Sequence, residues 1–72
     1  GVPRISRSGK WVTWNRNSKT YILDLTAAAL TPRVLLDKAN CSYFCARTWW
    51  IDPNSKQEYV FCLNNHGPIP GG

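Results

Sequence analysis

Hydrophobic and polar residues alternate in two stretches of this chain, and each stretch is divided by a short polar segment. The first stretch consists of KWVTW, the segment NRNS and KTYILDL, and it predicts a β-hairpin because Asn and Ser lie between two β-prone runs. With NRNS as a four-residue loop, Trp14 lies opposite Lys19. Val12 then lies opposite Tyr21. The face that we expect to pack into the core holds Val12, Trp14, Tyr21 and Leu23.

The second alternating stretch covers residues 41–64 and also predicts a hairpin. It consists of CSYFCARTWWI, the segment DPNS and KQEYVFCLN, and the Pro-Asn centre of DPNS suits a type I turn in a four-residue loop. In this register Ile51 lies opposite Lys56, and Arg47 lies opposite Val60. The large apolar residues that share one face, and that we expect in the core, are Phe44, Trp50, Tyr59, Phe61 and Leu63.

Two of the three cysteines meet in the second predicted hairpin. Its register places Cys45 opposite Cys62 with Cα atoms about 4.5–5.5 Å apart, so we predict a disulfide between them. Cys41 lies four residues before Cys45 on the same strand, about 13 Å away, and would remain a thiol. A Cys41–Cys62 bridge would need a slipped register, and a Cys41–Cys45 bridge would need a segment that is not extended. Zinc would need all three with His66, but the strand separates Cys41 from Cys45, so we expect neither metal nor cofactor.

The remaining segments complete an all-β prediction. RVLLD predicts a short buried strand, although a helix within residues 31–40 is an alternative because Thr and Pro precede this run. Residues 1–9 and 65–72 carry Gly, Pro and polar residues without periodicity, so we expect a flexible basic arm and a flexible tail. Between them, residues 10–64 predict one small antiparallel β-sandwich or barrel of five to six short strands.

Composition limits the functions that this chain can have. It has 72 residues, nine Lys and Arg against four Asp and Glu, and a net charge of +5, which favours acidic partners. No apolar run of about 18 residues is present, so we expect no membrane span. One histidine and scattered carboxylates form no nucleophile motif, so we expect no enzyme. The candidates for binding a partner, with both tryptophans expected on exposed faces, are Arg16, Lys19, Arg47, Trp49 and Trp11.

A small basic chain with cysteines, short strands and hairpin-like pairs resembles the secreted MAX effectors of plant-pathogenic fungi, which include avirulence proteins and ToxB-like proteins. The resemblance lies in the architecture of residues 10–64 and not in a motif. It implies a two-sheet β-sandwich, secretion with the option of translocation into the host cytoplasm, and binding of a host protein without catalysis. Family members commonly carry a cysteine near the first strand, whereas this chain has none before Cys41.

Together with the composition, this resemblance predicts a secreted, non-enzymatic, monomeric, effector-like binding protein of fungal origin that acts on a host plant protein. The alternative is a small basic module that binds nucleic acid or carbohydrate, because single strands are held by basic sheets with exposed aromatic residues. A strong dependence of affinity on salt would favour nucleic acid, and its absence would favour carbohydrate.

Overall fold

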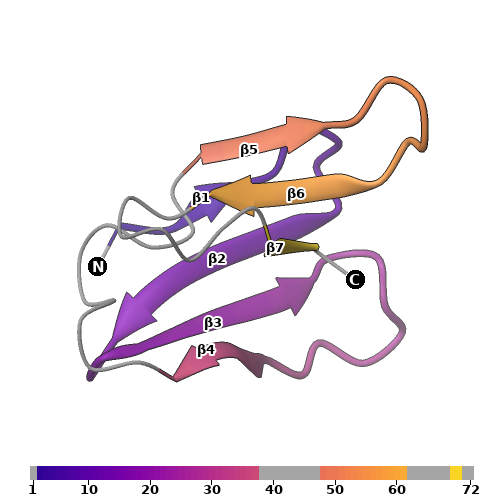
Figure 1. The fold of residues 1–72 in the computed structure, drawn as a ribbon. Coiled ribbons are helices and arrows are strands. Elements are labelled where there is room, and N and C mark those ends of the chain that lie inside the picture. Colours follow the sequence, from indigo (N-terminus) through magenta and orange to yellow (C-terminus); the bar gives the residue numbers. More distant parts are fainter. Residues whose placement is uncertain (1, 38–47, 62–68, 71–72) are drawn as a thin grey trace.

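All strands in the part of the chain that the structure describes belong to two antiparallel sheets (Figure 1). The computed structural model describes residues 2–37, 48–61 and 69–70. One sheet has the order β1-β2-β3-β4 and the other has the order β5-β6-β7. The all-β prediction is confirmed, with seven described strands in place of five to six. The strands are β1 (Arg4–Ile5), β2 (Trp11–Arg16), β3 (Lys19–Asp24), β4 (Arg33–Asp37), β5 (Thr48–Ile51), β6 (Glu58–Phe61) and β7 (Ile69–Pro70).

The first predicted hairpin is confirmed as β2 and β3, but its predicted register is wrong. The strands extend further than expected, and only Asn17 and Ser18 form the turn. Both have positive φ angles, 52° and 62°, which a two-residue hairpin turn of type I′ requires. Trp14 therefore lies opposite Tyr21 and not opposite Lys19. Asn tolerates this backbone region better than most residues, so a tighter turn replaces the expected four-residue loop.

The segment RVLLD forms strand β4, as preferred over the helical alternative, but the expectation that the strand is buried is wrong, because its residues are exposed or half-buried. β4 pairs with β3 and lies at the edge of the four-stranded sheet. The register shifts between Thr20 and Tyr21, so the partners of these two residues are Leu36 and Val34. Leu35 lies between those partners and packs against the core. The shift marks a β-bulge at Leu35, which has no partner on β3 in this register.

The second predicted hairpin is confirmed as β5 and β6, again with a corrected register. Ile51 lies opposite Glu58 and not opposite Lys56, because the loop consists of residues 53–56 and not 52–55. The Asp52 amide donates to the Gln57 carbonyl at 2.9 Å, and the Lys56 amide donates to the Asp52 carbonyl at 2.9 Å. Lys56 has a φ of 65°, which closes the loop one residue later than the sequence suggested.

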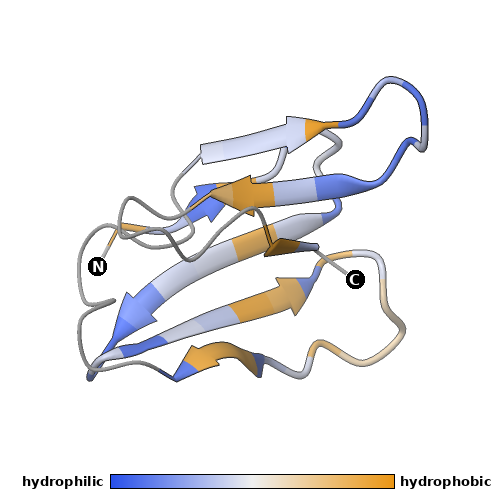
Figure 2. Cartoon of the chain, viewed as in Figure 1, coloured by the Kyte–Doolittle hydropathy of each residue, from blue (hydrophilic) through white to orange (hydrophobic). Residues whose placement is uncertain are grey.

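One hydrophobic cluster lies between the two sheets. Its buried members are Trp11, Ile22, Trp49 and Val60, which come from β2, β3, β5 and β6. Leu35 and Ile69 pack against them. Figure 2 shows hydrophobic segments along β3, β4 and β6, whereas the loop between β5 and β6 is hydrophilic.

The predicted core side is wrong in both hairpins. In the first hairpin, the predicted core residues are only half-buried. In the second hairpin Trp50 is 42% exposed and Phe61 is 37% exposed, while Trp49 is 5% exposed. Tyr59 is half-buried, and Phe44 and Leu63 lie outside the described residues. The residues that share a face were assigned correctly, but the face that is turned inward was not.

The buried polar residues explain this inversion. Thr13, Asn15, Thr20 and Glu58 all lie on inner faces. The Thr20 hydroxyl donates to Asn15 Oδ1 at 2.5 Å, and the Thr13 hydroxyl donates to the Arg4 carbonyl at 3.4 Å. A buried polar group costs little stability when it is hydrogen-bonded, so these faces can turn inward despite their polarity.

Parts of both chain ends belong to the sheets. Arg4–Ile5, within the segment expected as a flexible arm, form β1 and pair with Thr13 and Val12 of β2. Ile69–Pro70, within the expected tail, form β7 and pair with β6. Among the residues that the structure describes there is no helix, and so no helix long and apolar enough to cross a membrane.

Candidate binding surfaces

The outer face of the four-stranded sheet carries a continuous set of apolar, aromatic and charged side chains. These residues alternate with the buried positions of β2 and β3, and residues paired across strands share a face. We call this surface the basic aromatic face. Its members are Ile5, Val12, Trp14, Arg16, Lys19, Tyr21, Leu23, Val34 and Asp37.

A stacked aromatic pair forms the centre of the basic aromatic face. Trp14 and Tyr21 lie opposite each other on β2 and β3, with ring centroids 5.7 Å apart and an interplanar angle of 15°. Both side chains are half-buried. β1 pairs only with Val12 and Thr13 of β2, so no described strand lies beside Trp14 on the side away from Tyr21. Tyr21 thus supports one side of the Trp14 ring, and no described strand lies on its other side.

Two cations lie next to this aromatic pair. Arg16 and Lys19 are cross-strand partners at the hairpin end of the sheet, two positions from Trp14 and Tyr21, which is about 6.6 Å along each strand. Arg16 is exposed and Lys19 is half-buried. Asp37 lies opposite Lys19 on β4, so Lys19 has an acidic neighbour on the same face. The net charge of these three side chains is positive.

The opposite end of this face is aliphatic. Ile5 lies opposite Val12, and Val12 lies opposite Leu23. Ile5 is 65% exposed. A further exposed aliphatic residue, Val34, lies opposite Tyr21 and so beside the aromatic pair, and it is 45% exposed. The surface thus changes from aliphatic to aromatic to cationic along the strands.

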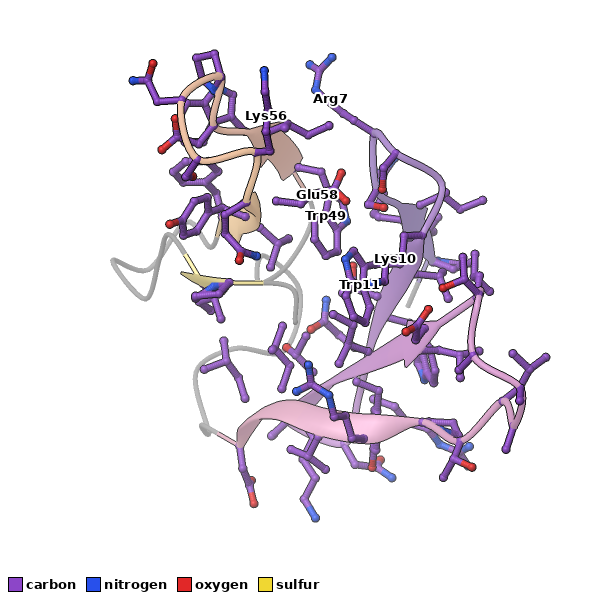
Figure 3. The ribbon with its side chains drawn as sticks, turned by 90° about the vertical axis from the view of Figure 1, so that its right-hand side faces the viewer. Arg7, Lys10, Trp11, Trp49, Lys56 and Glu58 are labelled. Atoms are coloured by element: carbon purple, nitrogen blue, oxygen red, sulfur yellow. The ribbon has the colours of Figure 1, made fainter. Side chains whose placement is uncertain are left out.

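A second cluster lies where the turn between β1 and β2 meets the three-stranded sheet. The Ser8 amide and hydroxyl donate to the two carboxylate oxygens of Glu58 at 3.1 and 2.6 Å. Arg7 Nε donates to the Trp49 carbonyl at 3.1 Å. Figure 3 shows Glu58 and Trp49 extending from the β5–β6 hairpin toward Lys10 and Trp11. These contacts connect the two sheets, because the β1–β2 turn belongs to the four-stranded sheet and Trp49 and Glu58 belong to the three-stranded sheet.

The interior of this junction is occupied by the two tryptophans that were predicted as exposed binding residues. Trp11 is 9% exposed and Trp49 is 5% exposed, so the expectation of exposed rings is wrong for both. Lys10 Nζ lies 4.8 Å from the centroid of the Trp11 ring, a cation–π distance. The Trp49 indole N–H is buried without a hydrogen-bond partner in the structure as described. Both rings belong to the core.

The other predicted site residues have different outcomes. Arg16 and Lys19 lie together on the basic aromatic face, as their position in the first hairpin suggested. Arg47 and the predicted Cys45–Cys62 disulfide lie outside the described residues, as does the rejected zinc set. Within residues 2–37, 48–61 and 69–70, no group of three or more His, Cys, Asp or Glu side chains could hold a metal ion.

Trp14, Tyr21 and Trp50 are surface residues that were not predicted as such. All three were assigned to the core because large apolar side chains are usually buried. The available signal was the number of aromatic residues, since four Trp, three Tyr and two Phe are more than so small a core can enclose.

Comparisons of this chain with protein-family models, with curated proteins and with solved structures found no match. The resemblance to the MAX effectors therefore stays a prediction from architecture.

Proposed function

We propose that this chain is a non-enzymatic binding protein that holds single-stranded nucleic acid on its basic aromatic face. One observation carries the proposal: the stacked pair of Trp14 and Tyr21 lies beside Arg16 and Lys19 on one solvent-facing surface. Bases stack on aromatic rings whatever their sequence, and phosphates bind cations. The net charge of +5 adds a long-range attraction to a polyanion.

The geometry suggests how one nucleotide would lie. A base stacks on the open side of Trp14, which Tyr21 supports from behind. The adjoining phosphate lies near Arg16, about 6.6 Å further along the strand. Lys19 contributes less than Arg16 because Asp37 lies opposite it. This arrangement predicts modest, sequence-tolerant affinity.

The test separates stacking from charge. Binding of a fluorescein-labelled 12-nucleotide oligo(dT) or oligo(U) is measured by anisotropy at several salt concentrations. Trp14→Ala should weaken binding by about 1–3 kcal/mol without changing the salt dependence. Arg16→Ala should reduce the slope of log K against log salt by about 0.7, the value for one lost phosphate contact, and the further change Lys19→Ala should reduce it by less than that. Lys56→Ala removes one exposed positive charge outside this face and serves as the control.

Two outcomes would refute the nucleic-acid proposal. One is the absence of saturable binding at low salt. The other is an equal change of slope in the Lys56→Ala control, which would mean that only net charge matters. Both outcomes can be measured on folded variants, because all of these positions are exposed or half-buried and the loss of the Trp14–Tyr21 stacking should cost only about 0.5–1.5 kcal/mol beyond the lost burial.

A protein partner is the second candidate, and the aliphatic end of the same face favours it. Ile5 and Val34 are exposed beside Trp14, Tyr21 and Arg16, and interfaces combine such apolar centres with Trp, Tyr and Arg anchors. This candidate corresponds to the secreted effector expected to act on a host plant protein. A plant protein captured by the wild type and by Leu30→Asp, but not by Val34→Asp, and then bound directly in purified form, would support it.

A further inference from the structure

The outer face of the three-stranded sheet is a small aromatic surface on the other side of the core from the basic aromatic face. Its residues alternate along β5 and β6 with the inward-facing Trp49, Glu58 and Val60. Pro70 of β7 is paired with Tyr59 and shares its face. We call this surface the neutral aromatic face. Its members are Thr48, Trp50, Tyr59, Phe61 and Pro70.

Trp50 is held in place on this face and has one open side. Its ring is stacked with Tyr59, with centroids 5.9 Å apart and an interplanar angle of 30°. It is tilted by 58° relative to Phe61, with centroids 6.4 Å apart. β5 is the edge of its sheet, so no described strand lies beyond Trp50. The indole is 42% exposed and is fixed by two neighbouring rings. Ligand binding would therefore cost little side-chain entropy at Trp50.

The described part of the neutral aromatic face offers one exposed ring as a platform. The structure describes four residues each of β5 and β6 and two of β7. Among them, Trp50 combines an exposed indole with two neighbouring rings that fix its position. A single flat platform of this kind matches one or two six-membered rings of a ligand.

The chemistry of the face selects a neutral ligand. None of its five described members is charged, in contrast to the basic aromatic face with Arg16 and Lys19. A phosphate or carboxylate would find no cation among them. Thr48 and Tyr59 supply hydroxyl groups that can hydrogen-bond to ligand hydroxyls beside the ring of Trp50. Pyranose sugars combine an apolar C–H face, which stacks on an indole, with hydroxyls around the rim.

We propose that the neutral aromatic face is a carbohydrate-binding site, with Trp50 as the stacking platform. The site binds one or two residues of a neutral oligosaccharide. It lies on a different sheet from the basic aromatic face, so it is independent of the proposed nucleic-acid site. Failure of either proposal leaves the other unaffected.

The experiment maps binding on the unmodified protein first. Uniformly ¹⁵N-labelled chain is titrated with hexasaccharides of β-1,4-linked glucose, β-1,3-linked glucose and β-1,4-linked N-acetylglucosamine. At least one sugar should shift the Trp50 indole N–H signal and the amide signals of Tyr59 and Phe61 in a saturable manner. The shifts should be the same at low and high salt, because no charge takes part. This mapping needs no variant, so it remains informative if a variant fails to fold.

Variants then test the role of the platform. Trp50→Ala should weaken the sugar affinity at least about tenfold, whereas Trp50→Phe should keep part of it. Leu30→Ala removes another exposed apolar side chain, 62% exposed and outside both faces, and should leave the affinity unchanged. Unchanged affinity in a folded Trp50→Ala variant, or shifts confined to other residues, would overturn the proposal. So would shifts that depend on protein concentration without sugar, because the occupant would then be a second copy of the chain.

Discussion

Replacing Ser8 with Ala should destabilise this protein more than a change at an exposed turn normally does. Ser8 lies on the surface, but its hydroxyl and amide donate to the carboxylate of Glu58, which is only 6% exposed. The hydroxyl makes the shorter of the two bonds, 2.6 Å to Oε1, and also accepts a bond from the Lys10 amide at 3.1 Å. The substitution therefore leaves one oxygen of a buried carboxylate without this donor.

The expected loss of unfolding free energy follows from the cost of leaving a buried hydrogen-bonding group without its partner. A bond to a charged group contributes about 1.5–3 kcal/mol, and the cost is highest when the partner left behind is buried. A domain of 72 residues has a total stability of about 4–11 kcal/mol. The Ser8→Ala variant should thus lose a substantial fraction of its stability. Its Tm should fall by at least about 6 °C, since 1 kcal/mol corresponds to about 4–8 °C at this size.

A double-mutant cycle isolates the interaction. In a Glu58→Ala background the carboxylate is absent, and the exposed Ser8 donors can bind water. Ser8→Ala should then cost less than about 0.5 kcal/mol. The difference between its cost in the two backgrounds is the coupling energy between Ser8 and Glu58, expected at about 1–3 kcal/mol.

Urea and thermal unfolding followed by circular dichroism measure these free energies. Ser55→Ala is the matched control, because the Ser55 hydroxyl accepts a bond from the Gln57 amide at 3.2 Å in an exposed loop. The control should lose no more than about 0.5 kcal/mol. The reasoning is refuted if Ser8→Ala is no more destabilising than Ser55→Ala, or if the coupling energy with Glu58 is zero.

Three further outcomes follow from burial, turn geometry and charge. Trp49→Ala should cost about 3–5 kcal/mol and Trp50→Ala at least 2 kcal/mol less, as measured by urea unfolding, because only the first ring is buried. Ser18→Gly should raise the unfolding free energy by about 0.5 kcal/mol, because a φ of 62° favours glycine; a lower Tm would contradict this. The side-chain hydroxyl of Thr26, followed by its amide, lowers the pKa of Asp24. The Asp24 carboxylate therefore stabilises the fold above its unfolded pKa and loses that effect as the pH falls through its folded pKa. Asp24→Asn should show a smaller drop in Tm than the wild type between about pH 5 and pH 2.

The alternation of residues along the strands predicted the secondary structure well. Both hairpins and the strand RVLLD are present, because alternation, β-prone residues and turn residues all act locally. Each predicted register was displaced by two residues. In the first hairpin the turn contracted to Asn17 and Ser18, and in the second the loop moved forward to end at Lys56. A displacement of two leaves every side chain on its predicted face, so the sets of residues sharing a face were correct.

The inner face of each hairpin could not be predicted from the sequence, because it depends on hydrogen bonds between residues that are far apart in the chain. Glu58 can be buried only because Ser8, fifty positions away, supplies two hydrogen bonds. Asn15 is buried next to Thr20, whose hydroxyl bonds to it across the hairpin. Counting hydrophobic residues on each face ignores these bonds and therefore favours the wrong side. The prediction of the candidate site was affected most, because Trp49 was predicted as exposed and the neighbouring Trp50 as buried, whereas the structure shows the reverse.

The outward orientation of several aromatic side chains connects the fold to its proposed functions. A chain of this length can cover one face of each sheet, and its inner faces use Trp11, Ile22, Trp49 and Val60 together with hydrogen-bonded polar residues. The remaining aromatic residues must then face outward, where they stabilise the sheets by stacking across strands. Outward rings that are already ordered need little further entropy loss to bind a ligand. Replacing them should therefore affect binding more than stability, and replacing the inner residues should do the reverse.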